Sequence, residues 1–175
     1  MRLGAQLFLS ALAAFCACGQ SEGQGVASYT GAYTNVDYGF SVTIPPGLKA
    51  TGAAKGAPNH GFVITLPGGG ILSVNAIYDI LGDEPGGSFE EQHRNSEGKP
   101  TARLGSLEAW DTTTRTKSGN GWSIARSITA VRTKGTDVPI IYVVSMSIDE
   151  SRLPRANPLF DRLVQSFVAL PIGRR

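Results

Sequence analysis

Apolar and polar residues alternate along much of the chain, a pattern typical of strands that bury one face. The segment 38–44 alternates in this way and stops at Pro45-Pro46-Gly47. Two further runs, 61–66 and 71–80, flank the turn Pro67-Gly68-Gly69-Gly70. Two β runs joined by a glycine-rich turn predict a hairpin.

Three longer β segments follow, at 102–117, 121–132 and 138–148, and glycine-containing turns separate them. The start of the last one is apolar at consecutive positions, which favours a central strand covered on both sides. The segment 48–60, rich in Ala, Gly and Lys, predicts a loop.

A capping-box sequence predicts a short helix between the hairpin and the longer strands. Ser88 is the expected N-cap, and Glu91 lies three residues later. We expect this helix to end at about Arg94 or Asn95.

A second helix is predicted near the C-terminus. Asn157 suits an N-cap and Pro158 a first-turn position. Apolar residues then recur at helical spacing, and we expect the helix to end near Ala169: Leu159, Phe160, Leu163, Val164, Phe167.

Strands with one inserted helix and one closing helix predict an α+β fold, with an antiparallel sheet of about six strands. The segments Tyr38–Leu48 and Pro158–Phe167 resemble the start and the closing helix of the PsbP-like family of extrinsic photosystem II subunits. The resemblance implies an α/β/α sandwich. It also implies a family whose members are mostly adaptors and assembly factors rather than enzymes.

The N-terminus has the pattern of an export signal. Arg2 precedes an apolar run, 3–15, which is shorter than the roughly 20 residues that a membrane-spanning helix needs. Ala17-Cys18 then resembles the bacterial lipobox, in which a small residue precedes the lipidated cysteine. Ordinary signal cleavage, which would release a secreted protein, and a buried N-terminal helix are the alternatives.

These features predict the organisation of the chain. We expect a signal peptide over 1–17, a lipidated Cys18 with a polar, glycine-rich tether over 18–28, and a single α+β domain over 29–175. Gly19 after the cysteine resembles the outer-membrane class of lipoproteins. The prediction is therefore a periplasm-facing, lipid-anchored envelope protein whose mature domain has no free thiol.

Charge bears mainly on the choice of partner. The formal net charge of +2 argues against nucleic acid, which requires a strongly basic face. Three arginines lie on neighbouring predicted strands: Arg115, Arg126 and Arg132. If their side chains share an exposed face, that face is expected to bind an acidic partner.

Catalytic chemistry has little support in the sequence. The acidic segment 79–91 together with His93 suggests a metal-dependent hydrolase, but its spacing fits a solvated helix face better. We therefore expect no catalytic residues, no metal and no cofactor. The preferred hypothesis is a non-enzymatic module that binds an envelope protein of unknown identity or supports envelope assembly. A small-molecule carrier with a pocket between sheet and helix is the third possibility.

Overall fold

The computed structural model describes residues 26–53, 60–80, 88–119 and 121–172. The predicted signal peptide and Cys18 lie outside these residues. Within the described part, no helix is long and apolar enough to cross a membrane.

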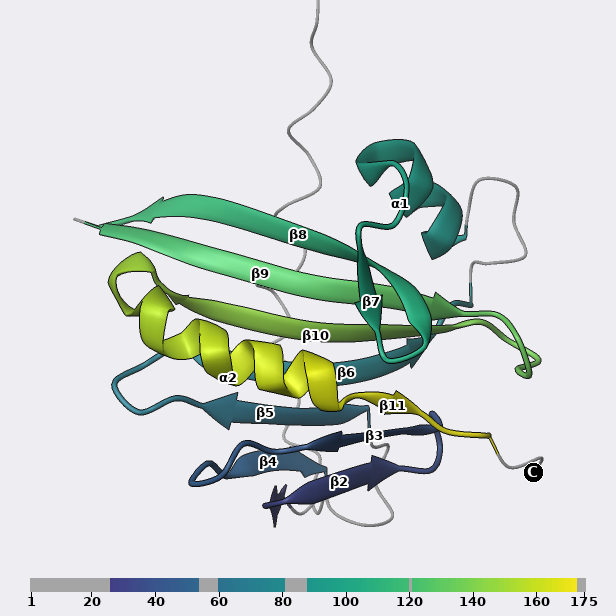
Figure 1. Ribbon diagram of the computed structural model, residues 1–175, viewed down its shortest axis with the longest axis horizontal. Helices are drawn as coiled ribbons and strands as arrows, with labels where there is room; N and C mark the ends of the chain where they lie inside the picture. The colour runs from purple at the N-terminus through teal and green to yellow at the C-terminus, as the bar shows by residue number, and fades with distance from the viewer. Residues whose placement is uncertain (1–25, 54–59, 81–87, 120, 173–175) are drawn as a thin grey trace, which may run out of the picture.

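The fold is α+β, as the sequence predicts, and two antiparallel sheets form it (Figure 1). The larger sheet has eight strands in the order β1 (Val26–Tyr29), β4 (Ala50–Ala53), β5 (Gly61–Thr65), β6 (Ile71–Tyr78), β10 (Ile140–Asp149), β9 (Gly121–Arg132), β8 (Leu107–Ser118) and β7 (Ala102–Leu104). The smaller sheet has three, in the order β11 (Val168–Ala169), β3 (Phe40–Thr43) and β2 (Ala32–Asn35).

The expectation of about six strands was too low, because the additional strands are short. The predicted loop over 48–60 contains β4, and β1 begins at Val26, inside the segment assigned to the tether. The predicted strand 102–117 divides into β7 and β8 at Gly105, whose φ is +60°. A Cβ at Gly105 would lie 2.8 Å from the carbonyl oxygen of Phe167, so this turn needs glycine.

The core lies between one face of the larger sheet, the smaller sheet and the C-terminal helix α2 (Leu153–Ser166). We call this the covered face of the larger sheet. Phe40 of the smaller sheet stacks on Phe167 with ring centroids 5.6 Å apart, and Tyr142 meets both rings edge-on. Residues at alternate positions of the central strands contribute to this core, and each is at most 5% exposed: Phe62, Ile64, Leu72, Val74, Ile128, Tyr142, Val144, Met146, Ile148.

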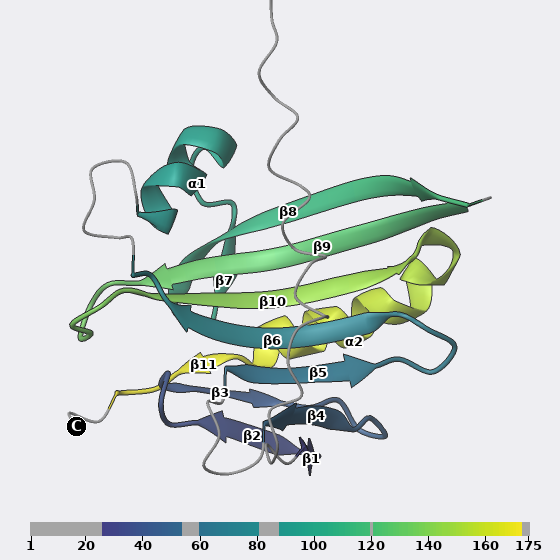
Figure 2. The ribbon, with the colours of Figure 1, turned by 180° about the vertical axis from the view of Figure 1, so that it is seen from behind.

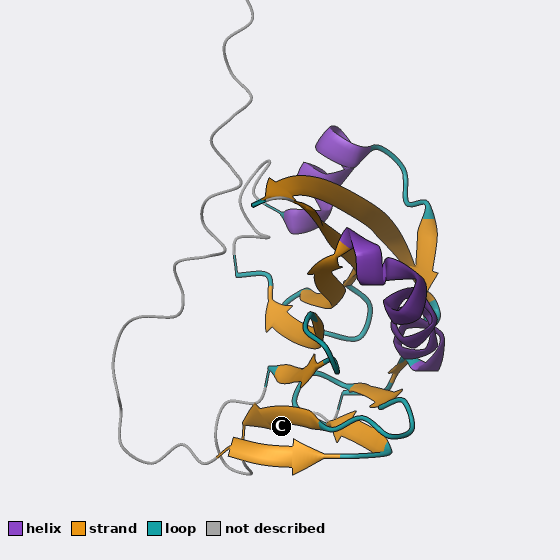
Figure 3. Ribbon diagram, turned by 90° about the vertical axis from the view of Figure 1, so that its left-hand side faces the viewer, coloured by secondary structure: helices purple, strands orange, loops and turns teal. Residues whose placement is uncertain are grey.

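The inserted helix α1 (Phe89–Glu97) begins where the sequence predicts and ends two residues later than expected. The backbone N–H of Glu91 donates to the Ser88 hydroxyl at 3.1 Å, so Ser88 is the N-cap. This helix lies on the opposite face of the larger sheet from α2 (Figure 3).

The predicted start of the second helix is wrong. A 3₁₀ turn, Glu150–Arg152, leads directly into α2, and Pro154 occupies its first turn. Asn157 and Pro158 therefore lie inside the helix rather than at its start. The added turn carries Ala156, which is 1% exposed, so packing against the core extends the helix upstream. The helix ends at Ser166, because Phe167 has extended backbone angles and leads into β11.

Candidate functional site

The three predicted partner-binding arginines lie on the covered face. Arg126 and Arg132 are two and eight residues after the buried Ile124 on β9, so their side chains point to the same face as Ile124. Arg115 of β8 is the direct partner of Ile124 and therefore shares that face. Arg126 lies nearest the core. It forms two hydrogen bonds to the Asp111 carboxylate, at 2.8 and 3.1 Å, and a third to Asp161 of α2 at 3.2 Å. The pKa of Arg126 is raised chiefly by the hydrogen bond to Asp111.

Arg115 and Arg132 also contact groups of the chain itself. Arg115 pairs with Glu150 at 2.7 Å and lies 4.1 Å from the centre of the Trp122 ring. Arg132 donates to the carbonyl oxygens of Leu170 and Lys134, at 2.6 and 3.2 Å. The three side chains therefore join neighbouring elements to one another. Their role as a basic docking face stays a prediction.

Residues of the predicted acidic site have structural contacts. The Asp79 carboxylate, 7% exposed, accepts a hydrogen bond from the backbone N–H of Phe89 at 2.9 Å and so anchors the start of α1. Glu90 pairs with Arg94 at 2.8 Å. Asp83 and Glu84 lie outside the described residues. Among the residues that are described, no three His, Cys, Asp or Glu side chains come close enough to hold a metal ion.

His93 lies between two aromatic rings. It stacks on Phe89 with ring centroids 4.2 Å apart and meets Trp110 edge-on at 5.3 Å. Burial in this aromatic contact lowers the pKa of His93, while Glu97 opposes the shift. Trp110 is 3% exposed and donates its indole N–H to the carbonyl of Gly98 at 3.0 Å. The cluster therefore attaches α1 to the sheet.

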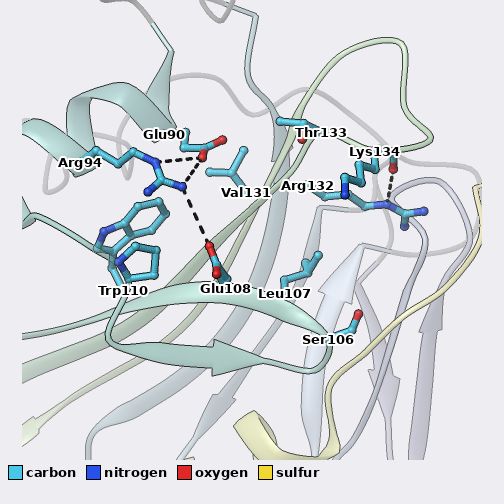
Figure 4. Close-up of a pocket in the computed structure, with 11 residues that line it drawn as sticks. Glu90, Arg94, Ser106, Leu107, Glu108, Trp110, Val131, Arg132, Thr133 and Lys134 are labelled. Carbon is cyan, nitrogen blue, oxygen red and sulfur yellow. Dashed lines mark hydrogen bonds and ion pairs between the residues drawn. The ribbon is translucent and has the colours of Figure 1, made fainter.

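A surface groove of about 610 Å³ lies between α1 and the turn that follows β9. Figure 4 shows Arg94 between Glu90 and Glu108 on one side of the groove, and Arg132 with Lys134 on the other. Leu107, Val131 and Trp110 also line it. Its charged lining differs from the closed apolar cavity that a carrier of apolar molecules needs.

The second face of the larger sheet is not covered by α2 or by the smaller sheet. Figure 2 shows these strands toward the viewer, with α2 behind them and α1 at one corner. We call it the open face. Directly paired residues of neighbouring strands share a face, so the register defines three rows across the sheet.

The middle row crosses seven strands and carries hydroxyl groups at every position except Val63: Thr112, Ser127, Ser145, Ser73, Val63, Thr51, Ser28. One flanking row consists of Thr114, Ala125, Ser147, Ile71 and Thr65. The other consists of Trp110, Thr129, Val143 and Asn75. None of these side chains carries a charge at neutral pH.

Hydroxyl groups and exposed apolar side chains therefore characterise the open face. The hydroxyls of Ser73 and Ser145 lie 2.7 Å apart across the β6–β10 pair. Those of Ser127 and Ser147 have no side-chain partner within the described residues. Val63, Ile71 and Ile77 on the same face are 37%, 46% and 47% exposed.

Sequence reasoning found these strands but not this face as a candidate site. The signal was present in the outward positions of the alternation. Hydroxyl residues recur at every second position of Thr112-Thr113-Thr114-Arg115-Thr116 and of Ser145-Met146-Ser147, where charged residues are common on a solvated strand face.

The fold has relatives among solved structures, although no protein-family model and no curated protein matches the chain. LpqN of Mycobacterium tuberculosis, described as involved in cell envelope biogenesis, is 14% identical and aligns with a TM-score of 0.55 over 83% of this chain and 92% of LpqN. A protein of Bacteroides thetaiotaomicron is 9% identical, with a TM-score of 0.55 over 83% of this chain and 50% of that protein. The chain thus spans about half the length of the Bacteroides protein.

PsbP of the cyanobacterium Synechocystis sp. PCC 6803 is 14% identical and aligns over 89% of this chain and 98% of PsbP, with a TM-score of 0.38. The likeness in fold therefore rests on the other two structures, whose TM-scores are higher. This chain has an α+β fold similar to that of LpqN.

Proposed function

We propose that this chain is a non-enzymatic, protein-binding module of the bacterial cell envelope, tethered through lipid at Cys18, and that its open face is the binding surface. The observation that carries the proposal is the composition of that face. Its three central rows are free of charge, and away from the row that Trp110 and Thr129 bury beside α1 it combines hydroxyl groups with exposed Val63, Ile71 and Ile77.

An uncharged face suits protein binding because little free energy is lost when water leaves it. A charged side chain that is buried at an interface needs a well-placed partner to offset its desolvation. A hydroxyl group needs only one hydrogen bond, and an exposed isoleucine gains free energy from burial. Interface centres are depleted in charged residues for the same reason.

Contacts within the chain weaken the hydrolase alternative. Asp79 accepts a hydrogen bond from the first N–H of α1, Glu90 pairs with Arg94, and His93 lies between aromatic rings. A general base or metal ligand must be directed toward substrate or metal rather than committed to packing.

The envelope location rests on two supports of different kinds. The apolar run before Cys18 has the pattern of a lipoprotein signal. LpqN, which shares the fold, is described as involved in cell envelope biogenesis. We extend that role to this chain as part of the proposal.

Site-specific crosslinking in intact cells tests the binding surface. A photoreactive amino acid is placed at Ser147 or Thr114 on the open face, and at the exposed Gln165 of α2 as the matched control. We expect a crosslinked protein species of defined mass from both open-face positions and none from Gln165. Mass spectrometry then identifies the partner.

Cell fractionation tests the tether independently. Cys18→Ser is expected to abolish lipid labelling and to move the chain from the membrane fraction to the soluble fraction. The proposal fails if neither open-face position enriches any protein and Cys18→Ser retains full function.

A further inference from the structure

We infer that the outer edge of β8 binds an extended, acidic segment of another protein, which joins the larger sheet as an additional strand. This inference goes beyond the proposed function, because the edge binds through backbone groups rather than through the side chains of the open face. Three observations support it: the length of the unpaired edge, the direction of its backbone hydrogen-bonding groups and the charge of the side chains beside it.

Strand β8 is much longer than the strand that covers its outer edge. β7 pairs only with residues 107–109, whereas β9 pairs with residues 109–118 on the inner side. We call residues 112–118 the free edge. Figures 1 and 2 show this end of β8, the end farther from α1, along the margin of the sheet with no helix or strand beside it. The outermost strands of the two sheets have only two to four residues, so this is the longest free edge in the described part of the chain.

The free edge has none of the backbone features that commonly prevent strand addition. It contains no proline, and its residues pair with β9 one by one without a bulge. Proline, a bulge or a covering element is the usual protection of an outer strand against pairing with another chain. Four of its seven residues are threonine, serine or both in alternation with cations, and threonine favours extended structure. The edge is therefore open to a further strand.

Alternate backbone groups of the free edge point outward. Beside β7, the carbonyl of Ala109 accepts the backbone N–H of Thr101 at 3.0 Å, so the backbone groups of Ala109 are directed away from β9. This direction alternates along an antiparallel strand, so it recurs at Thr113, Arg115 and Lys117. The outward N–H and C=O groups of these three residues have no partner within the described residues. They form the template that strand addition uses.

The charged side chains of the free edge are both cationic. Arg115 and Lys117 point to the covered face, and the free edge contains no Asp or Glu. Arg115 is held by Glu150 and by the Trp122 ring. Lys117 is exposed and has no side-chain partner in the described part of the chain. A carboxylate on an added strand would supply that partner.

The same charges disfavour a second copy as the added strand. Two free edges would bring four cationic side chains together, and neither edge has a carboxylate to offset them. Cationic side chains at an outer strand are a common means of preventing such self-pairing. They favour an acidic partner over a basic one for the same electrostatic reason.

The opposite side of the free edge specifies the remaining positions of the segment. Thr112, Thr114 and Thr116 alternate with the outward-bonding residues and point to the open face. Threonine pairs favourably with threonine, serine or β-branched residues on a neighbouring strand. The segment that fits the edge therefore alternates Asp or Glu with Thr, Ser or Val.

Amide hydrogen exchange of the full chain in detergent tests the inference. The probe is a synthetic peptide that alternates glutamate with valine and threonine, and the control peptide has lysine in place of glutamate. In the free chain, the N–H groups of Thr113, Arg115 and Lys117 are expected to exchange faster than those of residues 112, 114 and 116, which bond to β9. With the acidic peptide at about ten times its Kd, exchange at the three outward positions should slow about tenfold. The lysine peptide should leave it unchanged.

Two variants separate backbone pairing from charge. Thr113→Pro removes an outward N–H that β9 does not use, and is expected to raise the Kd of the acidic peptide about tenfold. Thr113→Val keeps that N–H and is the matched control. Lys117→Glu is expected to raise the Kd about fivefold, whereas Lys49→Glu makes the same change of charge at another exposed position and should have no effect. Thermal unfolding identifies any variant that does not fold, and Lys117→Glu tests the edge without Thr113→Pro.

The inference is overturned if the acidic peptide slows exchange at none of the three outward positions, or if both peptides slow it equally. It is also overturned if these positions become protected without peptide as the chain concentration rises, since the occupant would then be a second copy. The proposed function is tested separately. Crosslinking at Ser147 of β10, two strands from β8, reports on the open face whatever the result at the edge.

Discussion

The two faces of the larger sheet are formed by the same strands but have opposite chemistry. On β10, Val144 and Met146 are almost completely buried beneath α2, while Ser145 and Ser147, which alternate with them, point to the open face. Hydrophobic burial explains why the covered face is apolar. It does not determine which residues occupy the open face, since many polar and charged residues are compatible with solvent. The absence of charge from the middle of the open face, between Glu108 and Asp149 at the ends of the strands, is therefore informative about function, whereas the apolar residues on the covered face mainly report stability.

The largest expected difference between the faces concerns the aromatic core. Phe167 is 1% exposed and stacks on Phe40, so Phe167→Ala leaves a cavity in the covered face. We expect it to lower the free energy of unfolding by about 3–5 kcal/mol. Val63→Thr on the open face keeps the β-branched shape and is expected to change it by less than ~0.5 kcal/mol. Urea denaturation measures both, and equal losses would contradict the distinction between the faces.

Steric tolerance is expected to differ between two turns that have similar backbone angles. Gly105 and Gly119 have φ of +60° and +56°, so alanine is strained at both. A Cβ at Gly105 would lie 2.8 Å from the Phe167 carbonyl oxygen, whereas one at Gly119 would meet no atom of the other described residues within 4 Å. Gly105→Ala should therefore destabilise the fold by about 1–3 kcal/mol more than Gly119→Ala. Similar melting temperatures for the two variants would show that the edge of the covered face is loosely packed.

Replacing an arginine is expected to cost more stability at the centre of the covered face than at its rim. Arg126 bonds to Asp111 and Asp161 and lies 4.9 Å from the centre of the Phe160 ring. We expect Arg126→Met to cost about 1–2 kcal/mol, because charged hydrogen bonds between β8, β9 and α2 are lost. Arg115→Met removes a more exposed pair and should cost at most about 1 kcal/mol. Chemical denaturation measures the free energy of unfolding of both variants. A larger decrease for Arg115→Met than for Arg126→Met would contradict the view that Arg126 is the more important of the two for stability.

The smallest predicted effect is a pH dependence at the corner of the open face. Burial lowers the pKa of His93 in the folded chain below the ordinary value for a histidine side chain, about 6.5. As the pH falls below this value, the unfolded chain binds a proton more readily than the folded chain, so stability decreases. At higher pH the imidazole is neutral in both states and the effect disappears. Unfolding free energies at pH 7.5 and 5.5 should therefore differ less in His93→Gln than in the parent chain.

The sequence predicted the parts of the fold that have strong local signals. Alternation identified the long strands and the β5–β6 hairpin, and the capping box located the start of α1 at Ser88. The short strands β2, β4 and β11 have only two to four residues, so pairing with neighbours rather than local pattern defines them. Helix α2 starts before Asn157 because tertiary burial of Ala156 outweighs the capping preference.

The candidate site was less accessible to sequence reasoning for a related reason. A row such as Thr112, Ser127 and Ser145 exists only once three strands pair in register. The sequence also drew attention to charged groups, such as Arg126 and Asp79, that the fold uses to hold its elements together. Charged residues therefore drew attention to contacts within the fold, whereas the proposed binding surface is marked by the lack of charge in the middle of one sheet face.

Covalent footprinting by a carbene reagent in intact cells tests the open face most directly, with dilute purified chain as the reference. We predict reduced labelling in cells at the exposed positions Val63, Ile71 and Ser147, and unchanged labelling at Gln165 on α2. Equal labelling of the open face in cells and in dilute solution would show that nothing binds there and would contradict the central claim.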